Sequence, residues 1–74
     1  MILISQDEKN YINFNNIISI NIYKLPFNEK GFKIEAETIN DCLYTLGIYD
    51  TEERSKEIMN NVIRFECVFR MPKY

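Results

Sequence analysis

Residues 46–54, LGIYDTEER, mark the point at which the sequence changes from a strand pattern to a helix pattern. Asp50 is the expected N-cap of the helix, and Glu53, three positions later, completes a capping box with the first free N–H groups. Glu52 and Glu53 also fall in the first helical turn, where the positive end of the helix dipole favours carboxylates. The junction therefore predicts an α+β protein in which a strand leads directly into a helix.

Five extended segments precede this helix, and short polar turns connect them. They lie at residues 1–5, 11–14, 17–24, 32–38 and 43–49. Gly31 closes the loop after the third segment, while Asn15, Asn16, Asn40 and Asp41 are interpreted as turn residues because they tolerate left-handed backbone angles. Consecutive strands joined by short turns pair antiparallel, so the sequence predicts a five-stranded antiparallel meander.

Alternation within the segments predicts which side chains face the core. In the third segment Ile18, Ile20 and Ile22 share one face, and Tyr23 lies on the other. Gly47, inside the fifth segment, indicates a β-bulge or a close approach by another element. The side chains that share one face of the fifth segment are expected to be Tyr44, Leu46 and Ile48.

A single helix is predicted for residues 51–65, with an apolar stripe that covers the sheet. The stripe consists of Ile58, Met59, Val62 and Ile63. Residues 68–72 are expected to form a short terminal strand or an extended tail, which Pro72 ends. One helix covers only part of a five-stranded sheet, so the rest must curl into a half-barrel, remain polar or dock on another copy.

Composition limits the classes of protein to which the chain can belong. Its 74 residues suffice for one domain, and domains this short are often stabilised by self-association. The net charge of −2 disfavours a general binder of duplex DNA, which needs an excess of Lys and Arg. Without a signal peptide or an apolar run of about 18 residues, the protein is expected in the cytoplasm, with no membrane span. Cys42 and Cys67 are then expected as reduced, buried or half-buried thiols.

The residue inventory argues against catalysis and against a bound metal or cofactor. The chain has no His, which excludes Ser–His and Cys–His dyads. Two Cys are too few for a structural zinc site, and a phosphate-binding loop needs more glycines than Gly31 and Gly47. The numerous carboxylates fit a solvated strand face and a capped helix start. We therefore expect a non-enzymatic protein with no cofactor.

Tyrosines form the first group of candidate binding residues. Tyr11, Tyr23 and Tyr49 are all expected to be exposed. A tyrosine presents a flat apolar body with a polar tip, which suits protein interfaces and base stacking. Half-buried tyrosines are also common in strands, so a purely structural role is the alternative.

Arginines form the second group. Arg64 lies near the expected helix end, where it also complements the helix dipole. Arg70 lies between Phe69 and Met71, and an arginine in an apolar extended segment needs a partner. That partner is a carboxylate of this chain, a second subunit or an anionic ligand.

Several stretches of the chain follow the pattern of one protein family. They are ILISQD at 2–7, NFNNIISINI at 13–22, IEAE at 34–37, LGIYDTEERSKEI at 46–58 and FRMP at 69–72. In these stretches the chain resembles a family of small uncharacterised bacterial proteins that are frequent among phage and prophage genes. The most specific parts are YDTEER with its Lys-Glu-Ile helix and the terminal RMP. The family has no established catalytic residues, and the resemblance implies a phage accessory protein that blocks or diverts a host system, including its defences.

These observations predict a phage-derived, self-associating binding protein that acts in the host cytoplasm as a defence inhibitor. In one mechanism it occupies a host protein through an acidic face, which would consist of Glu35, Glu37, Asp41, Glu52 and Glu53. In the other it sequesters a small nucleotide-like signal in pockets where Arg64, Arg70 and the tyrosines contact phosphates and bases. The alternative function is that of a structural or assembly subunit in a larger phage complex.

Overall fold

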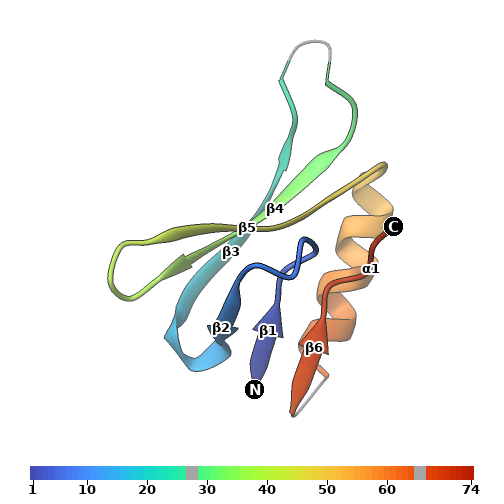
Figure 1. Cartoon of the computed structure of the whole chain (residues 1–74). Coiled ribbons are helices and arrows are strands. Elements are labelled where there is room, and N and C mark those ends of the chain that lie inside the picture. The colour runs from blue at the N-terminus through green and yellow to red at the C-terminus, as the bar shows by residue number, and fades with distance from the viewer. Residues whose placement is uncertain (27–28, 65–66) are drawn as a thin grey trace.

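The computed structural model describes residues 1–26, 29–64 and 67–74, which form six strands, one α-helix and one 3-10 helix (Figure 1). The strands belong to two three-stranded sheets, with the orders β2-β1-β6 and β3-β4-β5. The predicted α+β class is confirmed. The predicted five-stranded meander is wrong, because the first two strands do not continue into the sheet formed by the next three.

The first sheet has β1 (Ile2–Ile4) at its centre, between β2 (Tyr11–Asn13) and β6 (Val68–Arg70). β2 pairs antiparallel with β1, as a hairpin should, whereas β6 pairs parallel to β1. The expected terminal strand is thus present as β6, beside β1. A parallel neighbour needs a long crossover, and here the second sheet and the helix provide it.

A 3-10 helix, η1 (Phe14–Asn16), separates the two sheets along the chain. The side chain of Asn13 caps this turn by accepting a hydrogen bond from the N–H of Asn15 at 3.0 Å. Such a turn redirects the chain without reversing it into a hairpin. β2 and the strand that follows η1 therefore lie in different sheets.

The second sheet consists of β3 (Ile17–Lys24), β4 (Phe32–Thr38) and β5 (Leu43–Tyr49), all antiparallel to their neighbours. Gly31 has a φ of 113°, as expected of the glycine that closes the β3–β4 loop, although Phe27 and Asn28 of that loop lie outside the described residues. Asp41 has a φ of 64° in the β4–β5 turn, which confirms its left-handed conformation.

A register shift in β3 changes which isoleucines face the core. Ile17 pairs with Thr38 and Ser19 pairs with Glu37, so Ile18 is an extra residue in the ladder. Ile17, Ile20 and Ile22 pack against the core, whereas Ile18 is 59% exposed. The expectation that Ile18 faces inward is wrong because this bulge interrupts the alternation.

A second bulge has the same effect in β5. Ile34 pairs with Gly47 and Glu35 pairs with Thr45, so Leu46 is the extra residue here. After the bulge the alternation is reversed: Ile48 is 45% exposed and Tyr49 is buried, with 2% of its surface exposed. Of the two alternatives predicted for Gly47, a bulge or a close approach by another element, the bulge is present beside it, and the exposure expected for Tyr49 is wrong because of this bulge.

The helix α1 spans Glu52–Val62, one residue later than expected at its start. Its N-cap is Thr51, whose hydroxyl accepts a hydrogen bond from the N–H of Arg54 at 3.1 Å, and not Asp50. Thr51 has extended backbone angles, which the N-cap position requires. The expected end at Phe65 lies outside the described residues; the helix ends at Val62 with Ile63 as C-cap, and Ile63 is exposed rather than part of the stripe.

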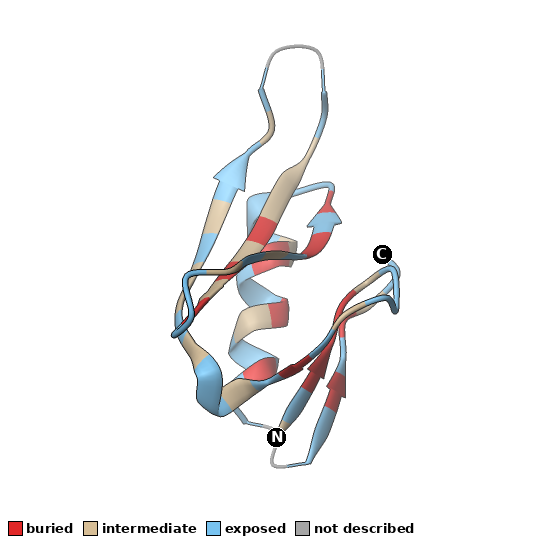
Figure 2. Cartoon of the chain, turned by 60° about the vertical axis from the view of Figure 1, so that its left-hand side comes forward, coloured by how far each residue is buried: buried red, intermediate tan, exposed pale blue. Residues whose placement is uncertain are grey.

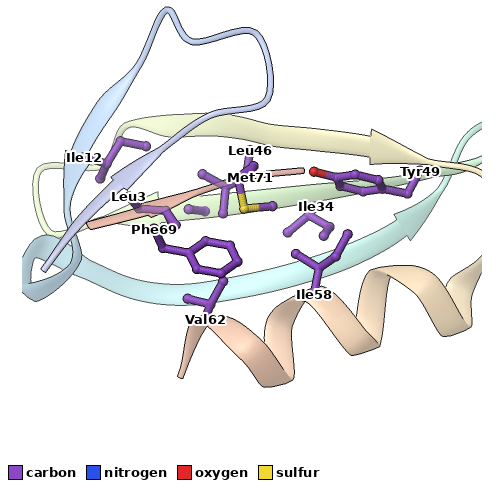
Figure 3. Close-up of a cluster of buried hydrophobic side chains, with 10 residues drawn as sticks. Leu3, Ile12, Ile34, Leu46, Tyr49, Ile58, Val62, Phe69 and Met71 are labelled. Carbon is purple, nitrogen blue, oxygen red and sulfur yellow. The ribbon is translucent and has the colours of Figure 1, made fainter. Parts of the chain in front are cut away.

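One core joins the two sheets and the helix. Buried residues gather where α1, β4 and the first sheet face one another (Figure 2). Leu3 and Phe69 from the first sheet lie in one cluster with Ile34 of β4 and with Ile58 and Val62 of α1 (Figure 3). The first sheet and the helix thus cover the inner face of β3-β4-β5, and the half-barrel considered for a meander does not form.

Candidate functional site

The five residues expected to bind a ligand or partner are distributed over five parts of the fold. Tyr11 lies on β2, Tyr23 on β3, Tyr49 on β5 and Arg70 on β6, while Arg64 follows the end of α1. Tyr23 is on the outer face of its sheet, where the ammonium of Lys33 lies 5.9 Å from the ring centroid. Tyr49 is on the opposite, buried face. The fold therefore does not assemble these residues into one pocket.

Arg70 has a partner within the chain. Its Nη1 donates a hydrogen bond to Oε1 of Glu8 at 3.1 Å, and Nζ of Lys73 lies 2.9 Å from Oε2 of the same carboxylate. The hydrogen bond from Lys73, with the charges of Lys73 and Arg70, lowers the pKa of Glu8 below its ordinary value. Of the three partners considered for Arg70, the structure contains the first, a carboxylate of this chain.

Tyr49 is a structural residue. Its hydroxyl donates a hydrogen bond of 2.7 Å to the carbonyl of Pro72, which fixes the C-terminal segment to β5. Burial raises the pKa of Tyr49 to about 12, with a smaller opposing effect from the charge of Arg54. A buried phenol with its own partner is not available to stack on a base.

The acidic residues do not form one surface. Glu35 forms an ion pair with Lys33 at 3.3 Å, and Asp41 lies in the β4–β5 turn. Glu52 and Glu53 are in the first turn of α1, beyond the other end of β5. Asp41 and Glu52 therefore lie beyond opposite ends of β5, whose seven residues span about 20 Å, and Glu35 and Glu37 lie on β4 between them.

A groove beside β2 combines Tyr11 with residues from the second sheet. Its volume is about 220 Å³. It is lined by Asn10, Tyr11, Ile12, Asn13, Asn16, Thr38, Asn40 and Tyr44. These residues come from the β2 edge, from η1 and from the β4–β5 hairpin, and we refer to this site as the β2 groove.

Local hydrogen bonds hold the walls of the β2 groove in place. The carbonyl of Asn16 accepts a hydrogen bond from the N–H of Ile39 at 2.9 Å, which ties η1 to the β4–β5 turn. The buried hydroxyl of Thr38 donates to Oδ1 of Asn40, and the N–H of Thr38 donates to the carbonyl of Cys42. These hydrogen bonds fix η1 and the β4–β5 turn relative to each other, and they form without any ligand.

The chemistry of the β2 groove is polar and uncharged. Its lining offers carboxamide and hydroxyl groups, which both donate and accept hydrogen bonds, and none of the described residues that line it is Asp, Glu, Lys or Arg. A hydrogen bond with Cys42 raises the pKa of the Tyr44 phenol further above neutral pH. Such a lining suits an uncharged group that hydrogen-bonds, and it offers no counter-charge to a phosphate or an amine.

Sequence reasoning identified Tyr11 but missed the asparagines of this groove, because asparagine is also frequent in turns with no binding role. The signal that could have revealed them is spacing. Asn10, Asn13 and Asn16 recur every third residue around β2, and Asn40 lies in the turn opposite. The thiols contribute nothing to the site's lining: Cys42 is half-buried and Cys67 exposed, contrary to the burial expected for the second.

Comparisons with family models, with curated proteins and with solved structures find no match for this chain. The resemblance to a phage protein family therefore stays a prediction. In the described part of the chain, no three or more Cys, Asp and Glu side chains group as metal ligands. The described helical segments include none with the length and apolarity needed to cross a membrane.

Proposed function

We propose that this chain is a non-enzymatic binding protein that occupies another protein through the β2 groove. The observation that supports this most directly is the groove itself, an open site of amides and hydroxyls at the free edge of a sheet. The resemblance seen in the sequence adds the context of a phage gene. In that context the partner is a host protein, and binding blocks or diverts a host system such as a defence.

Sequestration of a nucleotide-like signal is the less favoured mechanism. A nucleotide brings phosphates, which need cations or a cradle of N–H groups, and the groove lining contains no Lys or Arg. The groove volume of about 220 Å³ is also smaller than the range of about 300–1,000 Å³ that is usual for small-molecule sites. Arg70 is engaged by Glu8, and Arg64 lies beyond the end of α1.

A matched pair of substitutions tests the proposed function. Asn16→Trp fills the groove from η1, where the asparagine side chain is exposed, whereas Asn21→Trp adds the same ring on the outer face of β3. Each tagged variant is expressed in a bacterial host, and the retained proteins are identified by quantitative mass spectrometry. We expect one partner that the wild-type protein and the Asn21 variant retain equally and that the Asn16 variant loses.

Two outcomes would contradict this function. Retention of the same partner by all three proteins would place binding outside the groove. A nucleotide-sized ligand found by native mass spectrometry in the wild-type protein, and absent from the Asn16 variant, would favour sequestration instead. Self-association, which the sequence predicts, is measured in the same samples by sedimentation velocity.

A further inference from the structure

We infer that the β2 groove binds an extended, uncharged segment of its protein partner, which adds to the first sheet as a fourth strand alongside β2. This inference rests on the proposed function and specifies how the partner is bound. It follows from the hydrogen-bonding pattern of β2, from a comparison of the four sheet edges, and from the charge and size of the groove.

The pairing of β2 with β1 leaves one row of backbone groups directed outward. Ser5 donates its N–H to Asn10, and Phe14 donates its N–H to Met1, so these pairs are of the hydrogen-bonded type. Pair types alternate along an antiparallel ladder, which makes Leu3 and Ile12 hydrogen-bonded as well. Tyr11 and Asn13 therefore direct their N–H and C=O groups away from β1, toward the free edge and the groove.

Three of these outward groups are available to a partner. The carbonyl of Asn13 belongs to the N-cap of η1, where it accepts the first bond of the turn. The N–H of Asn13 and both backbone groups of Tyr11 have no strand of the described chain beside them. An extended segment laid along this edge can make three backbone hydrogen bonds, which is the basis of strand addition.

The other three sheet edges each carry a feature that hinders pairing and that β2 lacks. β3 has a bulge at Ile18 near its start and the charged Lys24 at its end. β5 is covered by Gln6, whose N–H donates to Leu46 at 2.7 Å and whose side-chain Oε1 accepts from the N–H of Ile48. β6 carries the charged Arg70, which Glu8 holds. β2 has no charge, no proline and no bulge over Tyr11–Asn13.

The groove determines which segment fits. A charged side chain placed against this uncharged lining would lose water without gaining a counter-charge, so the segment is uncharged where it crosses the groove. The volume of about 220 Å³ admits the side chains of only a short stretch. Alternate side chains of an added strand point to the same face, so one of them meets the amides of Asn16 and Asn40 while its neighbours face away.

Substitutions at Tyr11 separate backbone pairing from recognition of the ring. Tyr11→Pro removes the outward N–H and the ring together, and proline is tolerated on an edge strand whose N–H faces solvent. Tyr11→Val removes the ring and keeps the N–H. The probe is an acetylated and amidated heptapeptide that alternates Thr and Val around a central Asn, titrated against isotope-labelled protein by NMR.

We expect the probe to shift the amide resonances of Tyr11 and Asn13 more than that of Ile12, whose N–H faces β1. Tyr11→Pro should weaken binding by about ten-fold, the effect of one lost hydrogen bond, and Tyr11→Val by less than about three-fold. The same peptide with Asp at its centre, or with N-methylated alternate residues, should bind at least about ten-fold more weakly.

The inference and the proposed function fail in different ways. Equal weakening in the Pro and Val variants would show recognition of the ring and overturn strand addition, even if Asn16→Trp still abolishes partner retention. A wild-type dimer that Tyr11→Pro dissociates, with no peptide binding, would identify a second copy as the occupant and also overturn the inference. Loss of folding is monitored by the dispersed amide spectrum of each variant.

Discussion

At the scale of single residues, Gly47 and Tyr49 depend on each other. A Cβ atom on Gly47 would lie 2.7 Å from Cε2 and from the hydroxyl oxygen of Tyr49. The ring cannot easily move, because it is buried and its hydroxyl is bonded to Pro72. The close approach that a glycine inside a strand indicates is therefore made by a side chain two residues further along the same strand.

Gly47→Ala should destabilise the protein by about 1–3 kcal/mol, the usual effect of forcing an extra carbon into a packed site. Replacing a glycine by alanine within a strand normally stabilises the protein, because alanine loses less conformational freedom on folding. A destabilising effect of Gly47→Ala would therefore show that the contact with Tyr49 outweighs this gain. Urea unfolding followed by circular dichroism measures the change. Thr45→Ala, on the exposed side of β5, is the matched control and should change the free energy of unfolding by less than about 0.5 kcal/mol.

Tyr49 also makes stability depend on alkaline pH. Its pKa is raised to about 12 in the folded protein, against about 10 for an unfolded tyrosine. The unfolded state loses this proton first, so the contribution of Tyr49 is complete below pH 10 and is lost as the pH rises toward 12. The free energy of unfolding should therefore fall less steeply over this range in Tyr49→Phe than in the wild-type protein. Equal slopes would contradict the burial of the phenol.

At the scale of elements, alternation in the sequence located all three strands of the second sheet but assigned their faces correctly only in part. An extra residue such as Ile18 leaves an apolar pattern intact, so the pattern gives no sign that the residue faces outward. Gly47 did signal the bulge in β5, yet the reversal after it moved Tyr49 into the core and Ile48 out. Tyr49 is therefore a core residue and not a binding residue, because the one extra residue in β5 reverses the side-chain alternation after it.

The start of α1 provides a direct test of which residue caps the helix. Thr51→Ala should lower the free energy of unfolding by about 1 kcal/mol, because it removes the hydroxyl that accepts from the N–H of Arg54. Asp50→Ala should cost only a few tenths of a kcal/mol, since Asp50 precedes the cap and acts on the helix dipole alone. Thermal unfolding of both variants decides the matter. A larger loss of stability in Asp50→Ala than in Thr51→Ala would instead identify Asp50, the residue expected from the sequence, as the N-cap.

At the scale of the whole molecule, the arrangement of the two sheets could not be predicted from local pattern. The parallel pairing of β1 with β6 joins Leu3 to Phe69, from opposite ends of the chain, and both strands have only three residues. Strands of three residues can pair in several registers and with several neighbouring strands, and the packing of the core determines which pairing forms. The candidate groove shares this origin, because its walls come from β2 and from a hairpin some 25 residues later in the chain.

Because that core is shared, the two sheets should unfold together. Leu3 is fully buried in a cluster with side chains of β4, β6 and α1, so Leu3→Ala should cost about 2–5 kcal/mol. That is a large part of the roughly 5 kcal/mol available to a domain of this size. Ile2→Ala, at the neighbouring position on the exposed side of β1, should cost much less.

Hydrogen exchange distinguishes a shared core from two independent ones. In the Leu3 variant, the amide protons of β4 should lose protection by as much as those of β2, although β4 belongs to the other sheet. Selective loss in β2 alone would mean that the first sheet opens by itself. In that case the β2 edge would open locally without unfolding of the second sheet. Binding of a partner strand would then also cost the free energy of ordering this edge, which a rigid edge does not require.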